Sequence, residues 1–448
     1  MDYNTLSAGA GKAEIIFPQE MFPTDGFCGV HDTPCLRILV LDCGVRVAIA
    51  AAELVNVPDD AISQCQEMIS DKTGTRKENV WIHATHAITT PHAPLDPSIP
   101  INLPGGRPPR KENDRKNGEK RPGPPMDPDG PRKRRLFISA ILEATKEAAQ
   151  QAADSFGPAI LGVGTGFCDV NVNRDVETPF GWWVGINPDG PSNKTATVIK
   201  VENPGGEPIG YLISYGVKPC AVDNSQMEQK TRLVSADVPG EACRILEQKF
   251  GAPCLFVMSA AGDQVPKEQA LTEYVTEEGI VAKRDEGVQK GLEMVSRLGG
   301  EMAEAVAAVI ADTKCTVSAP SISRGAASVK VEAKERVPMK PVKNPVFQPD
   351  GRVIDLDADL ITIGDLALVA VKPETNVPTE AQLQEQSPFS HTLLMSMVNG
   401  GMKYMPDQDS YDRGTWEALS SMLMPGCAEK WVAAVTDALN EMKEKQSL

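Results

Sequence analysis

The sequence has no long apolar run and no closely spaced cysteine pair. A membrane-spanning helix needs about 18 consecutive apolar residues, and no segment of these 448 residues approaches that length. The ten cysteines are scattered without a Cys-x-x-Cys pair, which argues against a disulfide framework and a structural zinc cluster. Met1 to Thr5 lack the basic and apolar regions of a secretory signal. We therefore expect buried thiols in a cytoplasmic protein.

Positive charge is also in short supply. Lys and Arg number 45 against 61 Asp and Glu, which gives a formal net charge of −16. Nucleic-acid binding needs a basic surface that neutralises phosphates, so the composition argues against that class. An acidic surface also disfavours anionic membranes. The expected partner is therefore a small-molecule substrate, and the sequence is compatible with a homo-oligomer.

Apolar segments rich in β-branched residues alternate with helical patterns, which is typical of an α/β fold. We expect strands at residues 36–42, 45–52, 79–83, 159–163, 196–201, 210–215, 253–258, 360–363 and 366–371. Helices are predicted from Pro58 onward and at 137–156, 288–312 and 428–445. The predicted fold is α/β, with mixed β-sheets flanked by helices. Since no linker or repeat divides the chain, we expect a single domain over residues 1–448.

Residues 94–135 interrupt this alternation with proline, glycine and charge, and they end in Arg132-Lys133-Arg134-Arg135. Such a stretch cannot bury enough apolar surface to form a core element. A solvated insertion loop is the simplest interpretation, and a lid over a pocket is the alternative. A nucleic-acid or nuclear-localisation segment fits less well, because acidic residues and prolines interrupt the basic ones.

Three of the five histidines, His83, His86 and His92, lie within one short segment at the end of a predicted strand. Sites in α/β proteins form preferentially at strand ends, and imidazole is a common zinc ligand. His83 and His86 are three residues apart, so their side chains would point to opposite faces of a strand. They could share an ion only if the chain turns between them. A polar loop in which they bond backbone groups is the alternative.

Ala84-Thr85-His86 followed by Pro91 resembles a motif of the neutral/alkaline (non-lysosomal) ceramidase family, and further elements follow in the family's order. These elements are Gly29-Val30-His31, the strand 37–42, Asn173-Arg174, Ser235-Ala236-Asp237 with Gly240, Gly262-Asp263 with Pro266, Pro373-Glu374-Thr375, and Asn399-Gly400 through Tyr404 with Trp416-Glu417-Ala418. No single element is specific, but the ordered set spans about residues 26 to 427. The chain is identified as a divergent member that resembles the catalytic N-terminal domain and lacks the C-terminal β-sandwich of the secreted members.

The resemblance implies a zinc site assembled from distant parts of the chain. The positions that match family ligands are His86, Glu374 and Tyr404, and the fourth falls at Lys218, where the family carries histidine. A protonated ammonium cannot ligate a cation and would repel one. Three outcomes are then open. The site keeps its metal with three ligands or with a substitute for the fourth, or a neutral Lys218 acts as base or nucleophile. The third outcome is that the metal has been lost. The candidate substitutes are Cys220, Asp223 and His92.

Val265 is the second departure, since the resemblance places a catalytic serine near this point. Valine has no nucleophilic atom, and Ser259, six residues earlier, is not a candidate without geometry to support it. A metal-bound water could instead attack a carbonyl directly.

Two charged residues of the resemblance are further candidates for catalysis. Arg174 could bind a substrate carboxylate or stabilise an oxyanion, or it could form a structural salt bridge. Asp263 could orient a ligand or cap a helix that begins at Val265 or Pro266.

Several aromatic residues and histidines are candidates for substrate binding. Trp182 and Trp183 lie in a Gly- and Pro-rich loop and could line a pocket or pack beneath the loop. His31 and His92 are candidate pocket residues, and His31 could equally be a structural residue with satisfied hydrogen bonds. His391 is expected to cap or decorate a helix.

These observations lead us to expect a zinc-dependent hydrolase that cleaves an amide-like C–N bond in a small polar metabolite, with metal-bound water as the nucleophile. Ceramide itself is not expected, because nothing in the sequence indicates a lipid-facing apolar surface. The catalytic residues would be Lys218, Arg174, Asp263 and Tyr404. One alternative is an isomerase or lyase in which Lys218 and Tyr404 are an acid–base pair. Another is a non-catalytic binding protein derived from a hydrolase.

Overall fold

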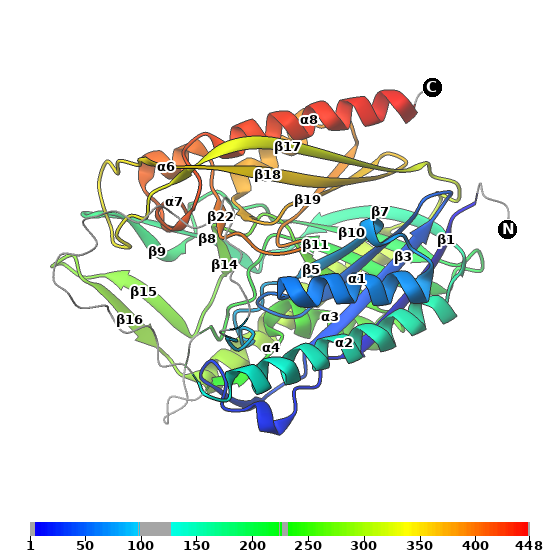
Figure 1. Cartoon of the computed structure of the whole chain (residues 1–448), viewed down its shortest axis with the longest axis horizontal. Coiled ribbons are helices and arrows are strands. Elements are labelled where there is room, and N and C mark those ends of the chain that lie inside the picture. The colour runs from blue at the N-terminus through cyan, green and yellow to red at the C-terminus, as the bar shows by residue number, and fades with distance from the viewer. Residues whose placement is uncertain (1–4, 97, 99–126, 224, 226–231, 447–448) are drawn as a thin grey trace.

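Three sheets form the framework of the fold in the computed structural model, which describes residues 5–96, 98, 127–223, 225 and 232–446 (Figure 1). The first sheet has the strand order β5-β4-β3-β1-β6, with only β4 and β5 parallel. Its strands are β1 (Ser7–Glu14), β3 (Cys35–Asp42), β4 (Arg46–Ala52), β5 (Val80–Ala84) and β6 (Gly157–Pro158). The predicted turn between β3 and β4 is present, and Gly44 there has a φ of 86° that only glycine adopts readily.

The second and third sheets have four strands each, and both mix parallel and antiparallel pairs. The second has the order β13-β11-β10-β7, and the third β17-β18-β19-β21. Their strands are β7 (Ile160–Phe167), β10 (Thr195–Glu202), β11 (Pro208–Tyr215), β13 (Cys254–Met258), β17 (Ile322–Lys334), β18 (Pro349–Ile363), β19 (Leu366–Ala370) and β21 (His391–Met395).

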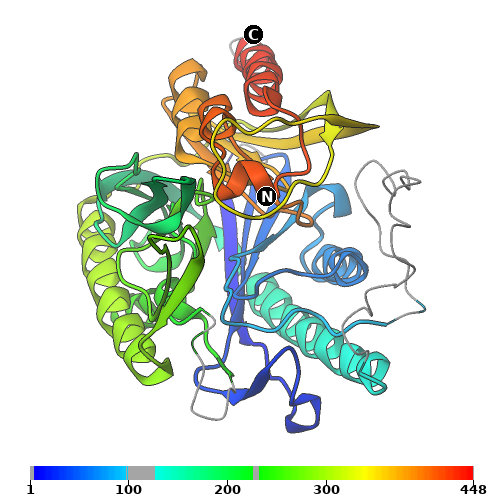
Figure 2. The same ribbon diagram turned by 90° about the vertical axis from the view of Figure 1, so that its left-hand side faces the viewer.

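Each sheet has a pair of long helices packed on it. Helices α1 (Asp59–Thr73) and α2 (Gly130–Asp154) cover the first sheet, and α3 (Asp237–Phe250) and α4 (Val288–Asp312) cover the second. Helices α5 (Val377–Gln386) and α8 (Cys427–Gln446) cover the third, with α8 along its outer side (Figures 1 and 2). The predicted α/β fold, with mixed sheets flanked by helices, is therefore confirmed.

Strand alternation divides the apolar side chains of the first sheet between two cores, and the third sheet forms a further core with α5 and α8. In β3, Ile38 and Val40 join the core that includes α1 to α4, while Leu39 and Leu41 point the other way. The second core also holds Leu212 of the second sheet and side chains of the third. The first sheet is therefore buried on both faces, which is why β3 and β4 read as continuous apolar runs.

Short elements connect these layers near the site. They are η1 (Gln19–Met21), β2 (Phe27–Val30), η2 (Lys77–Asn79), β8 (Asn171–Thr178), β9 (Gly181–Asn187), β12 (Arg232–Val234), β14 (Gln264–Pro266), β15 (Leu271–Val275), β16 (Val281–Asp285), β20 (Glu374–Thr375), β22 (Tyr404–Met405), α6 (Gln408–Arg413) and α7 (Trp416–Ser420). Small sheets join β14-β8-β9, β20-β22, β12-β2 and β15-β16. Most of these elements are too short for a periodic pattern, and the sequence did not predict them.

The basic run at the end of the predicted insertion belongs to α2, which begins seven residues earlier than we expected. Three of its charges are paired at 2.7 Å: Arg132 with Asp129, Lys133 with Asp127, and Arg134 with Asp60. These ion pairs let a charged segment form the first turns of a helix. Residues 97 and 99–126, on which the loop and lid hypotheses depend, lie outside the described residues, and the single-domain prediction stays a prediction.

The ten cysteines are free thiols, seven of them buried, as expected. Among the described residues, no helix is both long enough and apolar enough to cross a membrane.

Candidate functional site

The chain turns sharply between His83 and His86, so the two side chains enter different surroundings. His83 lies in β5 and is fully buried, with Nδ1 donating to the Ser396 carbonyl at 2.8 Å and Nε2 accepting the Met258 N–H at 3.0 Å. Burial lowers the pKa of His83 to about 3, so the ring stays neutral. His83 is therefore a core residue with both nitrogens satisfied. His86 follows the strand in a left-handed conformation, with φ of 61°.

Two very short strands place the other predicted ligands beside each other. β20 pairs with β22 in parallel, with Glu374 opposite Tyr404, and the Glu374 N–H donates to the Lys403 carbonyl at 2.8 Å. Lys218 follows the end of β11 by three residues. The candidate site thus forms where strands of different sheets end, as is usual in α/β proteins.

Four of the predicted residues are in direct contact and form what we call the Lys218 cluster: His86, Lys218, Glu374 and Tyr404. The Lys218 Nζ lies 2.6 Å from Glu374 Oε2 and donates to the Tyr404 hydroxyl at 3.0 Å. The His86 Nε2 lies 3.2 Å from Glu374 Oε1, and its Nδ1 donates to the Val55 carbonyl at 2.7 Å. A continuous series of contacts therefore runs from Val55 through His86, Glu374 and Lys218 to Tyr404.

The charges of this cluster are set by burial and by each other. Burial alone would raise the pKa of Glu374, but His86 and Lys218 outweigh burial and lower it to about 2. Burial and the charge of Arg174 would lower the pKa of Lys218, yet Glu374 and Tyr404 raise it above its usual value. The side chains of Lys218 and Glu374 are only 3% and 4% exposed. A buried ammonium–carboxylate pair therefore stands at the centre of the cluster.

The arrangement does not fit a zinc ion. The 3.2 Å between His86 Nε2 and Glu374 Oε1 is close to the roughly 3.3 Å that separates neighbouring ligands of tetrahedral zinc. The Lys218 ammonium, however, already binds the other carboxylate oxygen and the Tyr404 hydroxyl. A divalent ion about 4 Å from this ammonium would meet a repulsion of roughly 8 kcal/mol at an effective dielectric of about 20. In the described part of the chain, no group of three or more His, Cys, Asp or Glu side chains is placed to hold a metal.

The proposed substitutes for the fourth ligand are paired elsewhere or have raised pKa values, which disfavour the deprotonated form that binds a metal. His92 is 66% exposed and pairs with Asp25 at 2.8 Å. Burial raises the pKa of the Cys220 thiol well above its usual value, and it also raises the pKa of Asp223. The prediction of zinc at His86, Glu374 and Tyr404 thus stays a prediction, and the position of Lys218 argues against it.

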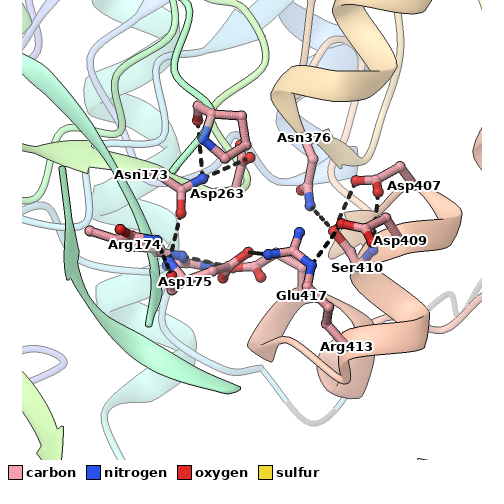
Figure 3. A network of polar contacts seen from close by, with 12 residues as sticks. Asn173, Arg174, Asp175, Asp263, Asn376, Asp407, Asp409, Ser410, Arg413 and Glu417 are labelled. Atoms are coloured by element: carbon pink, nitrogen blue, oxygen red, sulfur yellow. Dashed lines mark hydrogen bonds and ion pairs between the residues drawn. The ribbon is translucent and has the colours of Figure 1, made fainter. Parts of the chain in front are cut away.

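Arg174 lies beside the cluster in a buried ion pair. Its guanidinium carbon is 5.5 Å from the centre of the Tyr404 ring, and its Nε donates to Glu417 Oε1 at 2.7 Å (Figure 3). The Glu417 side chain is completely buried. The structural salt bridge that we considered for Arg174 is therefore present. Binding of a substrate carboxylate by Arg174 stays a prediction, since Glu417 already neutralises its charge.

Three buried acids, Asp175, Asp263 and Glu417, lie close together beside Arg174 (Figure 3). The Arg413 Nη1 also lies 3.9 Å from Asp175 Oδ2. Burial and the charge of Glu417 raise the pKa of Asp175 well above its usual value and that of Asp263 to about 7. Burial would raise the pKa of Glu417 as well, but Arg174 lowers it. Glu417 therefore carries the negative charge beside Arg174, while the raised pKa values of Asp175 and Asp263 favour the protonated form of both more than in a free carboxyl group.

Asp263 caps a helix, although not the one that the sequence suggested. Residues 264–266 form β14, so no helix begins at Val265 or Pro266. Instead, Asp263 Oδ1 accepts the Val377 N–H at 3.1 Å, at the first residue of α5, and Oδ2 accepts from Asn173 Nδ2 at 3.3 Å. Because α5 follows β20 directly, Asp263 helps to hold the segment that carries Glu374.

We expect Asp263→Asn to remove part of the pH dependence of stability. A pKa of about 7 in the folded protein exceeds the unfolded value near 4. The contribution of Asp263 is therefore fully present below about pH 4 and is lost as the pH rises through about 7. As the pH rises from 4 to 8, the wild type should lose up to about 4 kcal/mol of unfolding free energy through the ionisation of Asp263. Asp263→Asn should not show this loss. Urea denaturation at several pH values measures this, with the exposed Asp437→Asn as control. Parallel pH profiles for wild type and Asp263→Asn would contradict the assignment.

The two candidate tryptophans lie in a strand rather than a loop, because both belong to β9. Trp183 is buried, donates to Glu273 at 3.0 Å and packs edge-on against Trp416, with ring centres 5.2 Å apart. Trp182 lies beneath the Arg413 guanidinium, 4.7 Å from its carbon. The alternation of β9 therefore separates the pair, and their predicted role in substrate binding stays a prediction.

Two candidate histidines lie at other places in the fold. His31 is exposed just after β2, with its backbone N–H donating to Val234 at 2.8 Å. Its predicted role in substrate binding, like that of His92, stays a prediction. His391 is the first residue of β21, so our expectation that it caps or decorates a helix was wrong. The five residues of β21 follow the segment Ser-Pro-Phe-Ser. Their sequence alone does not distinguish a short parallel strand from the start of a helix.

Sequence reasoning missed Glu417 and Asp175 as members of the site. Glu417 stands in the resemblance at Trp416-Glu417-Ala418, and Asp175 follows Arg174 directly. A buried arginine requires an anionic partner, but the sequence does not tell which of 61 acidic residues folds against it.

No protein-family model and no curated protein sequence matches this chain. Solved structures do match it by fold, and two of them carry ceramidase titles. One is titled as an analysis of neutral ceramidase from Pseudomonas aeruginosa, with a TM-score of 0.69 and 14% identity over 98% of this chain and 75% of that chain. The other, titled ceramidase complexed with C2, has a TM-score of 0.68 and 13% identity over 98% and 76% of the two chains. This chain has the fold of the neutral ceramidases. At such identities the likeness concerns the fold alone.

Proposed function

We propose that this chain is an enzyme that hydrolyses an amide-like C–N bond in a small polar molecule, with Tyr404 as the proton donor. The observation that carries the proposal is the contact of Lys218 with Tyr404, 3.0 Å from nitrogen to hydroxyl oxygen, in a centre that Glu374 holds together. The likeness to the ceramidase fold supports an amide as the bond attacked. A centre built of charged groups favours a polar substrate.

Tyr404 is the group through which the cluster would reach a substrate. It is partly exposed, whereas Lys218 and Glu374 are buried. Because its oxygen accepts the Lys218 hydrogen bond, its own hydrogen points elsewhere and is free to be donated. Transfer of that proton to the leaving nitrogen would leave a phenolate, which the ammonium stabilises. The water that attacks the carbonyl carbon releases the proton that restores Tyr404.

His86 and Glu374 would position Lys218 rather than act on the substrate. Both ring nitrogens of His86 are engaged, one with the Val55 carbonyl and one with Glu374. Both carboxylate oxygens of Glu374 are likewise engaged. A carboxyl group whose pKa is about 2 is also a weak base at neutral pH.

An isomerase or lyase is the second candidate, and the same Lys218–Tyr404 contact favours it. Proton transfer to and from carbon needs an acid–base pair but no activated water. The two reactions differ in the fate of solvent oxygen, because only hydrolysis adds it to the product.

The test is a screen of the purified protein against small N-acyl compounds in water enriched in ¹⁸O. Hydrolysis would place one ¹⁸O atom in the carboxylate product, and isomerisation or elimination would place none. Tyr404→Phe should lower kcat by about 10² to 10⁴, as expected for loss of a general acid. The control is Tyr274→Phe, at a tyrosine that is 48% exposed in β15. Full turnover in Tyr404→Phe would remove the proposed role, and ligand binding without turnover would favour a binding protein.

A further inference from the structure

A polar cavity lies between the second and third sheets, and it shares no residue with the Lys218 cluster. It has a volume of about 230 Å³ and is lined mainly by hydroxyl and amide side chains, with Glu380 as its carboxylate. Ser259 and His391, which the proposed mechanism does not use, both lie on its wall.

The cavity begins where the apolar core between the sheets ends. On the inward face of β10, Ile199 and Val201 belong to that core, but Thr197 on the same face lines the cavity. Thr197 is in register with Thr165 of β7 and with Ser214 of β11, so three hydroxyl residues form a row across three strands. A well-packed interior would fill this place with apolar side chains. The hydroxyl row therefore indicates a space built for polar contents.

Glu380 lies on the opposite wall, in α5, and its side chain is almost completely buried. The Asn193 Nδ2 donates to its Oε2 at 3.1 Å. Among the described residues that line the cavity, the only other titratable side chain is His391, and none is a lysine or arginine. Burial accordingly raises the pKa of Glu380 to about 7, with hydrogen bonds from Asn193 and Ser259 opposing it. A buried carboxylate without a countercharge is costly, and a cationic ligand would relieve that cost.

We propose that this cavity binds a small primary ammonium compound, with the ammonium on Glu380 and its other polar groups on the hydroxyl row of Thr165, Thr197 and Ser214. An ammonium group donates three hydrogen bonds, which suits a carboxylate flanked by hydroxyl oxygens. Gln384 and Ser390 line the cavity and are exposed, so the cavity is open to solvent. The site is separate from the proposed reaction at Tyr404.

The first test is titration of the purified full-length chain with 2-aminoethanol, ethylene glycol and potassium chloride, followed by calorimetry or, for millimolar affinities, by ligand-observed NMR. The amine should bind, and the neutral diol should bind at least tenfold more weakly. Equal binding of the diol would overturn the proposal, since the charge of Glu380 would then play no part. Binding of potassium without the amine would also overturn it, because the site would then take an inorganic cation.

Substitutions of residues that line the cavity test whether the amine binds there. Glu380→Gln should weaken amine binding at least tenfold, and Glu385→Gln, on the exposed side of the same helix, should leave it unchanged. If Glu380→Gln fails to fold, Thr197→Val gives the second measurement, because it removes one hydroxyl and keeps the shape. It should weaken binding of 2-aminoethanol more than that of ethylamine. Wild-type affinity in Glu380→Gln, or in Thr197→Val, would overturn the proposal.

The pH dependence of binding gives an independent check. The amine stays protonated between pH 6 and pH 8, whereas Glu380, with a pKa of about 7, ionises over this range. Binding should therefore be about tenfold tighter at pH 8 than at pH 6. His391→Gln should keep this dependence, and Glu380→Gln should abolish it. Loss of the dependence in His391→Gln would assign it to the histidine and contradict the proposal.

Discussion

Replacement of Lys218 by histidine is expected to raise the zinc content of the purified protein from a small fraction to about one equivalent per chain. The substitution removes the ammonium that now lies 2.6 Å from Glu374 and 3.0 Å from the Tyr404 hydroxyl. It also supplies the nitrogen donor that the resemblance places at this position. His86, Glu374 and Tyr404 would then no longer face the Lys218 ammonium, and the nearby charge of Arg174 stays paired with Glu417. The wild type, in contrast, should retain little zinc, because Lys218 already supplies the positive charge of the site.

Metal analysis of protein purified without chelator measures this directly, whether or not a substrate is known. The added variant Glu374→Ala in the Lys218→His background should lose the zinc again. The control is Lys283→His, at an exposed lysine in β16, which should leave the metal content unchanged. About one zinc in the wild type, lost in His86→Ala, would instead confirm the zinc site that the sequence predicts. The ammonium would then have to leave the position that it occupies in this structure.

Truncation of Arg174 to methionine is expected to lower the free energy of unfolding by about 3 to 5 kcal/mol. The change leaves Glu417 as a completely buried carboxylate without its cationic partner. It also removes the guanidinium that lies 5.5 Å above the Tyr404 ring. Replacement of both partners, Arg174→Met with Glu417→Leu, should recover most of the loss, because no uncompensated charge then remains.

Urea denaturation of the wild type, the two single variants and the double variant gives the coupling energy of the pair. The control is Arg324→Met, which breaks an ion pair with Asp359 at the surface of the third sheet. That change should cost less than about 1 kcal/mol, since solvent screens the exposed pair. If the double variant were as unstable as Arg174→Met alone, packing of Arg174 against Tyr404 would outweigh its charge.

Many of the secondary-structure predictions proved correct because buried segments carry their own patterns. The prediction of helix 288–312 matches α4 at both ends, since its apolar residues recur with a helical period. The buried strands β4 and β11 were visible as apolar runs for the same kind of reason. By contrast, β20 and β22 have two residues each, which is too few for any pattern, although they place Glu374 beside Tyr404.

The four residues of the Lys218 cluster were predictable from the resemblance, but the acids around Arg174 and the chemistry of the site were not. The resemblance correctly grouped His86, Lys218, Glu374 and Tyr404, which the structure brings into contact. It could not show that the ammonium lies between the carboxylate and the phenol, because that depends on how three separate strand ends meet.

Residue identity and local spacing were enough to predict the α/β class, the helices α1, α2, α4 and α8, and a lysine where the resemblance expects a histidine, whereas α3 was not predicted. These properties are local, since they follow from residue identity and from spacing along one segment. Which charges are paired, by contrast, depends on how distant segments meet in the fold. The partners of Arg174 and Lys218 lie 243 and 156 residues away along the chain, at Glu417 and Glu374. Folding also removes these groups from water, and burial combined with a specific partner sets the protonation of Glu374 and Asp263.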